Sequence, residues 1–374
     1  MISRQDIQRL LHVADAMGPV LSVFLDMSVN SENKRTYMVF LNQERSRHGE
    51  LDSDRDAHHR EAIGAALERV ERWIADSFEE ANKGVAVYTV IGGDWLEGLQ
   101  FPVSVRNRVE ISDRPVIGPL AQVVESHPRH GVILVDREHL RLIGVVLGEP
   151  VIEHEVRTEP YPAPHALKRG GYSAKDYQKR KAEEVRHFFK EFALEATEFD
   201  RRYRPDDLVL LGTADNVRRF TEFLPQQLRA KVVHTAHAPI AAGAAEVLER
   251  LAPFFREQLR RGEEEVVGLL HERVRQAHLA VAGFRRTLEE LQEAQVELLV
   301  LPRDGRHLGA RCLRCGFHVA GTASACPYCR GTLRDGVDLV EAMIGLAEEQ
   351  NVTVRFVEPP ALVDLDGVGA LLRF

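Results

Sequence analysis

The sequence has little cysteine: its 374 residues include four, and all of them lie between positions 312 and 329. Cysteines gathered in one short segment are typical of a metal site rather than of a disulfide framework. The chain also has no apolar run of membrane-spanning length and no apolar segment behind a basic start. These absences argue against a membrane span and a signal peptide, so we expect a cytoplasmic protein.

Two further absences narrow the function. No phosphate-binding P-loop motif is present, so nucleotide hydrolysis is not expected. Positive charge is not in excess either, because the net charge is −8. The chain is therefore not a uniformly basic nucleic-acid binder, and a phosphate-rich partner would have to meet a local basic patch.

Strand and helix patterns alternate along the chain, which predicts an α/β fold. The length exceeds what one ordinary core supports, so several domains are expected. We expect an N-terminal α/β domain at 1–127, a middle domain at 128–203 that opens with a β-hairpin, and a C-terminal α/β sandwich at 204–374. A ribbon at about 308–333 interrupts the C-terminal domain, and a long helical region is expected at 241–293.

The strongest local motif is a pair of Cys-x-x-Cys sequences. On tight turns, two such pairs place four thiolates tetrahedrally around Zn²⁺, and a site closed by four thiolates is structural rather than catalytic. Gly316 follows the first pair and Gly331 the second, and we expect both to supply the backbone freedom that these turns need. Redox-active pairs and a metal-free ribbon are the alternatives. The four predicted zinc ligands are Cys312, Cys315, Cys326 and Cys329.

The second motif is the glycine pair Gly170-Gly171, which follows a proline-rich stretch and opens a predicted helix. Glycine can bring bare backbone close to a ligand. The helix is basic in its first turns and apolar in its later turns, which we expect to pack on the hairpin while the basic end projects outward. A cationic stem of this kind suits RNA, and an ordinary loop-to-helix junction is the alternative. The candidate RNA-binding residues are His165, Lys168, Arg169, Lys175, Lys179, Arg180 and Lys181.

The glycine pair is followed by Tyr172 and Ser173. In a catalytic interpretation, backbone N–H groups at this turn approach a reacting carbonyl and stabilise an oxyanion. A phenol has a pKa of about 10, so a tyrosine here would be a poor base at neutral pH. It can still donate a hydrogen bond or stack on a nucleobase.

Three stretches resemble the class-one translation termination factors of archaea and eukaryotes and their relative Pelota. Residues 130–136 resemble the opening of that family's middle domain, and residues 169–177 resemble its Gly-Gly-Gln-Ser-Ala loop and helix. The third stretch runs from 208 to 374 and includes the four-cysteine ribbon, which is similar to that of archaeal members. The resemblance covers roughly the last two-thirds of the chain.

The resemblance implies an RNase H-like middle domain whose tip reaches the ribosomal peptidyl-transferase centre. It gives Gly170 and Gly171 the role of promoting water attack on the peptidyl-tRNA ester, with Tyr172 at the glutamine position and Ser173 after it. If catalysis in the family uses backbone N–H groups, hydrolysis is retained here; if it needs the glutamine side chain, hydrolysis is lost or altered. The resemblance further implies that the C-terminal domain binds a translational GTPase or another partner.

The N-terminal domain departs from the termination factors. It contains no counterpart of their Asn-Ile-Lys-Ser loop or of their Tyr-x-Cys-x-x-x-Phe element, so stop-codon decoding is not expected. What remains resembles the bacterial termination-factor-like proteins, relatives of the Vms-type rescue factors and of the hibernation factor Balon.

Two functions follow from this resemblance, with ribosomal RNA and peptidyl-tRNA as partners and a monomer as the expected state. The first is an A-site factor that promotes peptidyl-tRNA cleavage in ribosome rescue without decoding a codon. The alternative is a non-catalytic hibernation factor that occupies the A site and the peptidyl-transferase centre. RNA processing and protein binding on the same scaffold also remain open, and so does the question of whether the chain is an enzyme.

Overall fold

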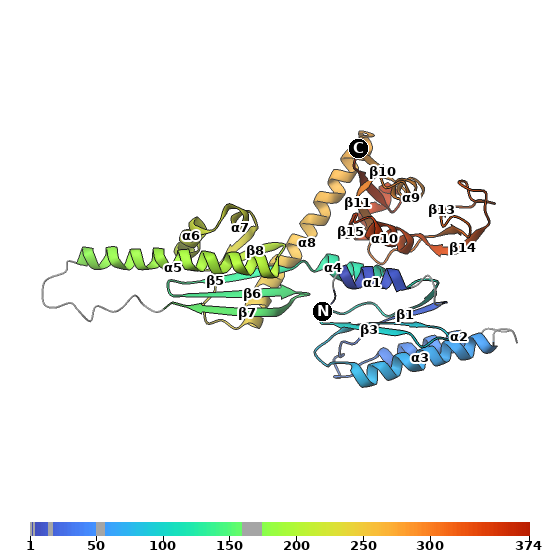
Figure 1. The fold of residues 1–374 in the computed structure, drawn as a ribbon, viewed down its shortest axis with the longest axis horizontal. Helices are drawn as coiled ribbons and strands as arrows, with labels where there is room; N and C mark the ends of the chain where they lie inside the picture. Colours follow the sequence, from blue (N-terminus) through green and yellow to red (C-terminus); the bar gives the residue numbers. More distant parts are fainter. Residues whose placement is uncertain (1, 3, 14–17, 50–56, 159–173) are drawn as a thin grey trace. The chain divides into compact units, whose positions relative to one another are not determined.

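The chain forms two compact units. The discontinuous unit contains Met1–Ser126 and Arg256–Phe374, and the inserted unit contains His127–Phe255. The first and last parts of the chain thus share one unit, whereas the sequence predicted three successive domains. The computed structural model describes residues 2, 4–13, 18–49, 57–158 and 174–374 (Figure 1).

The inserted unit is built on a 5-stranded sheet. Its strands are β5 (His130–Val135), β6 (His139–Val146), β7 (Glu149–Arg157), β8 (Asp207–Gly212) and β9 (Val232–Ala236). Their order across the sheet is β7-β6-β5-β8-β9. β5, β6 and β7 pair in antiparallel, which confirms the predicted hairpin, and β8 and β9 continue the sheet in parallel.

β8 lies beside β5 in the middle of this sheet and not in a separate C-terminal domain. Val209 stands opposite Val132, and Leu211 stands opposite Leu134. The unit therefore ends at Phe255, where the sequence analysis expected an end at residue 203. An apolar strand that is buried on both faces fits any central position of a sheet, so its sequence does not identify its neighbour.

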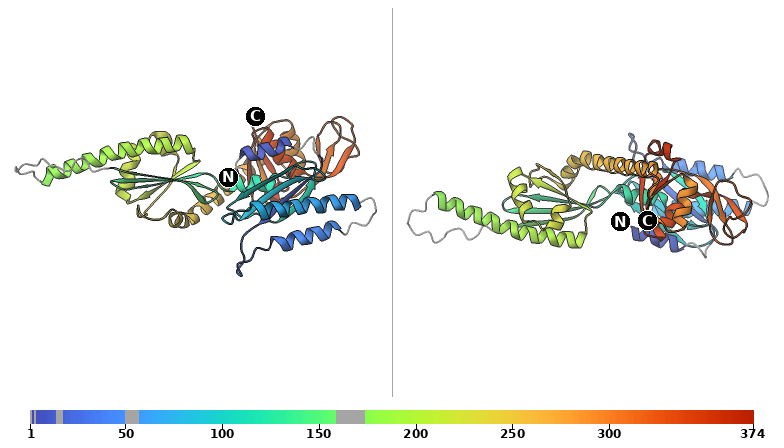
Figure 2. Two further views of the ribbon diagram at one scale, coloured as in Figure 1. Left: turned by 60° about the horizontal axis from the view of Figure 1, so that its bottom comes forward. Right: turned by 90° about the horizontal axis from the view of Figure 1, so that it is seen from above.

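Helices cover both faces of the sheet of the inserted unit (Figure 2). α5 (Ala174–Tyr203) and α6 (Ala214–Phe223) lie on one face, and the first turns of α8 (Ala244–Arg275) lie on the other. α5 projects beyond the strands of its own unit, as the sequence predicted (Figure 1). The unit also contains the short helix α7 (Gln226–Ala230).

The later turns of α5 pack on the sheet, which confirms the predicted change from a projecting to a buried half. Phe189 and Phe192 are fully buried, and the Phe189 ring lies 5.8 Å from that of Phe220 on α6. Gly144 in β6 makes room for α5, because a Cβ there would lie 2.8 Å from the ring of Tyr203.

The two ends of the inserted unit meet. The ring of His130, at the start of β5, stacks on Phe255 with 3.8 Å between the ring centroids. His130 Nδ1 also lies 2.7 Å from a carboxylate oxygen of Asp207. The chain therefore enters and leaves this unit at nearly the same place.

The single long helical region expected at 241–293 is wrong. α8 ends at Arg275, and β10 (Ala280–Ala282) and α9 (Phe284–Gln292) follow it. Ala277 and Leu279 have φ angles of 49°, and Gly283 has a φ of 83°, so the backbone leaves the helical region here. Apolar residues at similar spacing on both sides of the break hid it from sequence analysis.

In the first part of the discontinuous unit, a 4-stranded antiparallel sheet has the order β3-β2-β1-β4. These strands are β1 (Val20–Asp26), β2 (Gly84–Val90), β3 (Leu96–Phe101) and β4 (Arg108–Ser112). α2 (Tyr37–Gly49) and α3 (Ala57–Ser77) cover one face, where Leu67 and Val70 pack against Val23 (Figure 1). On the other face, the Tyr88 hydroxyl donates to the carbonyl of Val116 at 2.9 Å.

The last part of the discontinuous unit contains a second 4-stranded sheet and a small 3-stranded ribbon sheet, ordered β10-β16-β11-β15 and β13-β12-β14. The new strands are β11 (Val296–Pro302), β12 (Leu308–Cys312), β13 (His318–Ala320), β14 (Leu333–Asp338), β15 (Thr353–Val357) and β16 (Gly369–Leu372). The remaining helices of the unit are α1 (Arg4–Val13), α4 (Gly118–Ser126), α10 (Leu339–Glu349) and the 3-10 helix η3 (Pro359–Leu365).

Within the part of the chain that the structure describes, no helix combines the length and the apolar content that crossing a bilayer requires.

Candidate functional sites

The two Cys-x-x-Cys sequences form paired turns in the ribbon sheet. In the first turn, the N–H of Gly316 donates to the Cys312 carbonyl at 3.0 Å, and Gly316 has a φ of 77°. In the second turn, Arg330 rather than a glycine takes the left-handed conformation, with a φ of 61°. Gly331 is needed for space instead, because a Cβ there would lie 2.9 Å from Arg314 Cβ and 3.0 Å from Cys312 Sγ.

The four sulfur atoms converge on one point. Cys312 Sγ lies 3.5 Å from Cys329 Sγ, and Cys315 Sγ lies 3.7 Å from Cys326 Sγ. All four atoms lie within 4.8 Å of one another. Tetrahedral thiolates with Zn–S bonds of about 2.3 Å stand about 3.8 Å apart, so the cluster fits this ion.

The geometry favours a metal site over redox pairs. Each sulfur has its short contact with a cysteine of the other pair, whereas a redox-active pair joins the two cysteines of one motif. None of the four cysteines forms a disulfide. Backbone N–H groups of Cys315 and Arg314 lower the pKa of the Cys312 thiol to about 6, whereas, against the N–H of Phe317, burial and the neighbouring cysteines raise the pKa of Cys315 to about 12.

The residues predicted to act at the glycine pair lie outside the described residues. These are His165, Lys168, Arg169, Gly170, Gly171, Tyr172 and Ser173. Lys175, Lys179, Arg180 and Lys181 fall in the first turns of α5, of which the structure describes the backbone but not these side chains. Their roles therefore stay predictions.

The start of α5 does define where the glycine pair is attached. α5 begins at Ala174, directly after Ser173, and its first turns extend past the end of the sheet (Figure 1). The first N–H groups of a helix have no partner within the helix, and the helix dipole makes this end attractive to anions. The described helix therefore begins directly after the predicted motif in the sequence.

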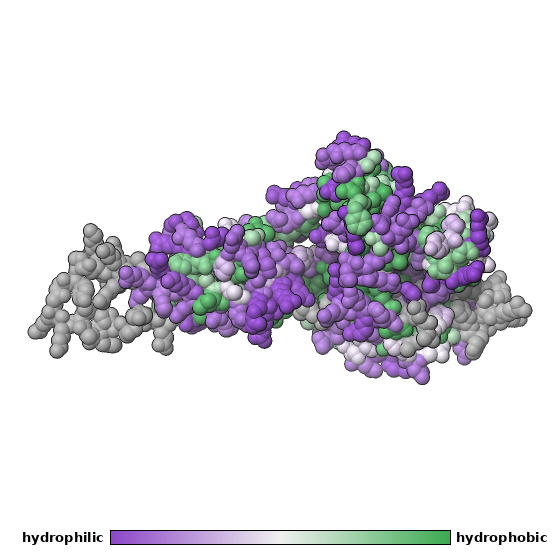
Figure 3. Space-filling model, turned by 45° about the horizontal axis from the view of Figure 1, so that its top comes forward, coloured by the Kyte–Doolittle hydropathy of each residue, from purple (hydrophilic) through white to green (hydrophobic). Residues whose placement is uncertain are grey.

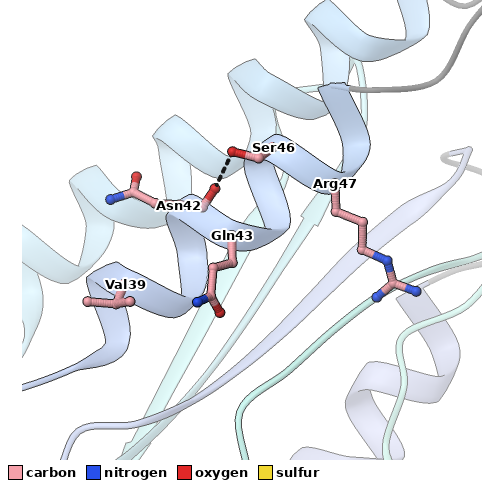
Figure 4. A pocket seen from close by; sticks show the side chains of 5 residues that line it. All are labelled: Val39, Asn42, Gln43, Ser46 and Arg47. Atoms are coloured by element: carbon pink, nitrogen blue, oxygen red, sulfur yellow. Dashed lines mark hydrogen bonds between the residues drawn. The ribbon is translucent and has the colours of Figure 1, made fainter.

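A shallow hollow of about 540 Å³ lies on α2 and was not predicted as a site (Figure 4). All of its lining residues come from this one helix: Val39, Asn42, Gln43, Ser46 and Arg47. The Ser46 hydroxyl donates to the Asn42 carbonyl at 3.1 Å and is thus engaged with the helix backbone (Figure 4). The hollow has neither a convergent set of titratable groups nor an enclosing wall, so we assign it no chemistry.

A buried charge cluster joins the two parts of the discontinuous unit, and the sequence analysis missed it. One carboxylate oxygen of Glu341 on α10 accepts hydrogen bonds from the N–H groups of Ile117 (3.1 Å) and Gly118 (3.0 Å), at the start of α4. The other oxygen lies 3.4 Å from the Arg108 guanidinium on β4. Arg108 also lies 3.6 Å from the carboxylate of Asp338.

One sequence signal could have found part of this cluster. Asp338 and Glu341 have the spacing of a capping box before an apolar run. Asp338 does cap α10, since its carboxylate accepts the N–H of Val340 at 3.0 Å. Glu341, however, caps the distant helix α4, a partner that no local pattern can indicate.

Burial sets the acidity of this cluster. It raises the pKa of Glu341 to about 7, against the opposing effects of Arg108 and of the Gly118 N–H. Burial also raises the pKa of Asp338. The cluster contains no exposed nucleophile, so we interpret it as a structural link between the two parts of the unit.

The inserted unit matches a known protein family. Residues 115–256 match the model of "Bacterial archaeo-eukaryotic release factor family 10". This range contains α4 and the whole inserted unit, including the glycine pair. Over this range, the chain is similar to a family of bacterial release-factor-like proteins.

Two named relatives extend the likeness beyond this range. Peptide chain release factor subunit 1 of Pyrococcus abyssi is 23% identical over 299 residues, which cover 69% of each chain. The same subunit of Thermococcus sibiricus is 23% identical over 296 residues, again 69% of each chain. These findings confirm the resemblance to the class-one release factor and Pelota superfamily, in its bacterial branch.

Solved structures of related proteins align with the chain at low scores. A model of ribosome-bound archaeal Pelota and ABCE1 aligns with a TM-score of 0.43 and 14% identity, over 100% of this chain and 94% of that one. Archaeal translation termination factor aRF1 aligns with a TM-score of 0.26 and 16% identity, over 100% and 99%. Scores of this size do not define a common arrangement of the whole chain.

Proposed function

We propose that this chain is a ribosome-associated factor that enters the A site without decoding a stop codon and promotes peptidyl-tRNA cleavage in ribosome rescue. One observation carries the proposal: the release-factor family match spans the inserted unit, in whose sequence the glycine pair lies just before α5. The mixed sheet of this unit, three antiparallel strands followed by two parallel ones, supports an RNase H-like middle domain.

The proposed chemistry is hydrolysis of the ester between peptide and tRNA. Water adds to the ester carbonyl carbon, the bond to the tRNA 3′ oxygen breaks, and a proton from water passes to that oxygen. Negative charge develops on the carbonyl oxygen, and in this proposal backbone N–H groups at Gly170, Gly171 and the start of α5 would stabilise it. Tyr172 and Ser173 would orient the water by hydrogen bonds rather than act as bases.

The proposed partners are RNA and a translational GTPase. Cations on the first turns of α5 would hold the phosphates of ribosomal RNA or of the tRNA acceptor end. The family resemblance adds a translational GTPase as a proposed partner of the discontinuous unit. We also propose that the ribbon holds a structural Zn²⁺ and that the protein acts in the cytoplasm.

A second function is favoured by one residue. Tyr172 stands where the termination factors have glutamine. If hydrolysis needs the glutamine side chain, the same unit would occupy the peptidyl-transferase centre without cleaving, as a hibernation factor does. Binding would then depend on the basic stem and not on the tip.

The experiment that tests the proposal is single-turnover cleavage of labelled peptidyl-tRNA on ribosomes with an empty A site. Wild type, Gly171→Ala and Tyr172→Phe are compared, with ribosome pelleting beside each. Gly243→Ala is the matched control, because Gly243 lies in the same unit and an added Cβ meets nothing within 4 Å. Gel analysis of the tRNA separates ester hydrolysis from cleavage in the acceptor end.

We expect Gly171→Ala to lower the cleavage rate at least about 100-fold with pelleting unchanged, because the added Cβ restricts the backbone and would displace an N–H donor from the oxyanion. Tyr172→Phe should show whether the hydroxyl takes part. Tight pelleting of the wild type without cleavage would sink the rescue function and favour hibernation. Failure to pellet would contradict both.

A further inference from the structure

The ribbon is a basic part of an acidic chain. Residues 305–334 contain five arginines and no aspartate or glutamate, although the chain has 57 acidic residues in all. This is the longest stretch of the sequence without an acidic residue. It belongs to the discontinuous unit, so it is separate from the basic stem of α5.

The two cysteine turns form a tip that exposes an aromatic ring. Tyr328, in the second turn, is 80% exposed, and Leu313, in the first, is 65% exposed. The ring of Phe317 lies almost parallel to that of Tyr328, with 5.8 Å between centroids and 8° between planes. Phe317 thus supports the tyrosine ring, most of which remains open to solvent.

The two cysteine turns also carry two arginines without carboxylate partners. Arg314 and Arg330 are exposed, and neither forms an ion pair among the described residues, whereas Arg334 pairs with Asp113. The turns that carry them adjoin, since a Cβ at Gly331 would lie 2.9 Å from Arg314 Cβ. A zinc ion with four thiolates has a net charge of about −2, which explains some nearby arginine but not an exposed phenol ring.

Apolar exposure alone does not single out the tip. Figure 3 shows apolar surface in more than one place on the discontinuous unit. Val363 on η3 is 70% exposed, for example, but Asp364 and Asp366 follow it closely in the sequence. Among the described residues, Phe374 beside Arg373 is also an open ring next to a cation, but no second ring stacks on it, whereas Phe317 backs Tyr328 and the tip adds two unpaired arginines. That combination suits nucleic acid better than an apolar protein surface.

We propose that the ribbon tip is a second RNA contact, which binds single-stranded RNA. A base stacks on the open face of Tyr328, and Arg314 and Arg330 hold the adjoining phosphates. Such binding is tolerant of sequence, because every base has a π-face. This contact lies outside the residues proposed for peptidyl-tRNA cleavage and goes beyond that function.

The test measures RNA affinity of the full chain by fluorescence anisotropy. The probe is a labelled single-stranded RNA of mixed sequence, about 12 nucleotides long. The variants are Tyr328→Ala, Tyr328→Phe and the double variant Arg314→Ala/Arg330→Ala. Phe374→Ala is the aromatic control, because Phe374 is 79% exposed on the same unit. Arg275→Ala/Arg373→Ala is the charge control, and zinc content and circular dichroism report folding of each variant.

We expect Tyr328→Ala to weaken binding at least about fivefold and Tyr328→Phe to keep wild-type affinity, because the ring and not the hydroxyl stacks. The double arginine variant should reduce the salt slope of log K by about 1.4, the share of two phosphates on a single strand. Both controls should bind as the wild type does.

Wild-type affinity and salt slope in Tyr328→Ala and the double variant, both with full zinc, would overturn the inference. The inference would also be overturned if Tyr328→Phe lost as much RNA affinity as Tyr328→Ala. If the tip variants bind RNA normally but lose ribosome pelleting, the tip docks on protein and the RNA assignment is wrong. Gly171→Ala does not touch the tip, so failure of the cleavage proposal is a separate result.

Discussion

At the scale of single residues, Glu341 gives the most direct link between position and stability. Its pKa is raised by burial from 4.5 to about 7, so the folded unit keeps a proton that the unfolded chain has already lost. The resulting stabilisation is fully present below pH 4.5 and is lost as the pH rises through about 7. Its size is at most about 3 kcal/mol, because the side chain is 16% exposed and partly solvated.

We expect Glu341→Gln to flatten the pH dependence of unfolding. Glutamine can still accept a hydrogen bond from the start of α4 but cannot titrate. Chemical denaturation between about pH 5 and pH 8 should show a smaller loss of stability in the variant than in the wild type. Glu349→Gln, on the same helix and paired with Arg114 at 3.5 Å, is the control. Parallel curves for wild type and Glu341→Gln would show that Glu341 does not titrate in this range.

At the scale of elements, the sequence predicted those features that depend only on residues close together in the chain. The β5–β6 hairpin, the buried half of α5 and the cysteine turns all follow from periodicity or spacing within about 30 residues of sequence. The neighbour of β8 and the partner of Glu341 depend on contacts across the fold, which no local window contains. The glycine-pair residues, which the sequence predicts as the catalytic tip, stay predictions.

The ribbon sheet should depend on the proposed zinc more than any other element does. Its 3 strands are short, and a small sheet with so little core is marginal unless a metal joins the turns. We expect chelation, or Cys326→Ser at a fully buried ligand, to remove hydrogen-exchange protection from β12, β13 and β14. Protection in α5 should persist, which makes that helix the internal control. Unchanged exchange in the ribbon of demonstrably zinc-free protein would contradict a structural metal.

At the scale of the whole molecule, the inserted unit should fold alone. All 5 strands of its sheet lie within His127–Phe255, and its two ends meet at the His130–Phe255 stack. We expect a fragment of residues 127–255 to unfold in one cooperative transition. A fragment that ends at residue 203, the boundary expected from the sequence, lacks β8 and β9 and exposes the apolar edge of β5. That shorter fragment should aggregate or show no transition, and two equally stable fragments would favour the earlier boundary.

Because the discontinuous unit is built from both ends of the chain, its two parts are synthesised at different times. Synthesis runs from the N-terminus, at about 5–20 residues per second, so Arg108 and the start of α4 emerge long before Glu341. For on the order of ten seconds Arg108 and the start of α4 must wait without the Glu341 carboxylate, while the inserted unit can already fold. In the nascent chain, the inserted unit can therefore be folded while the first part of the discontinuous unit still lacks its last part. That first part is the segment that a chaperone would have to shield.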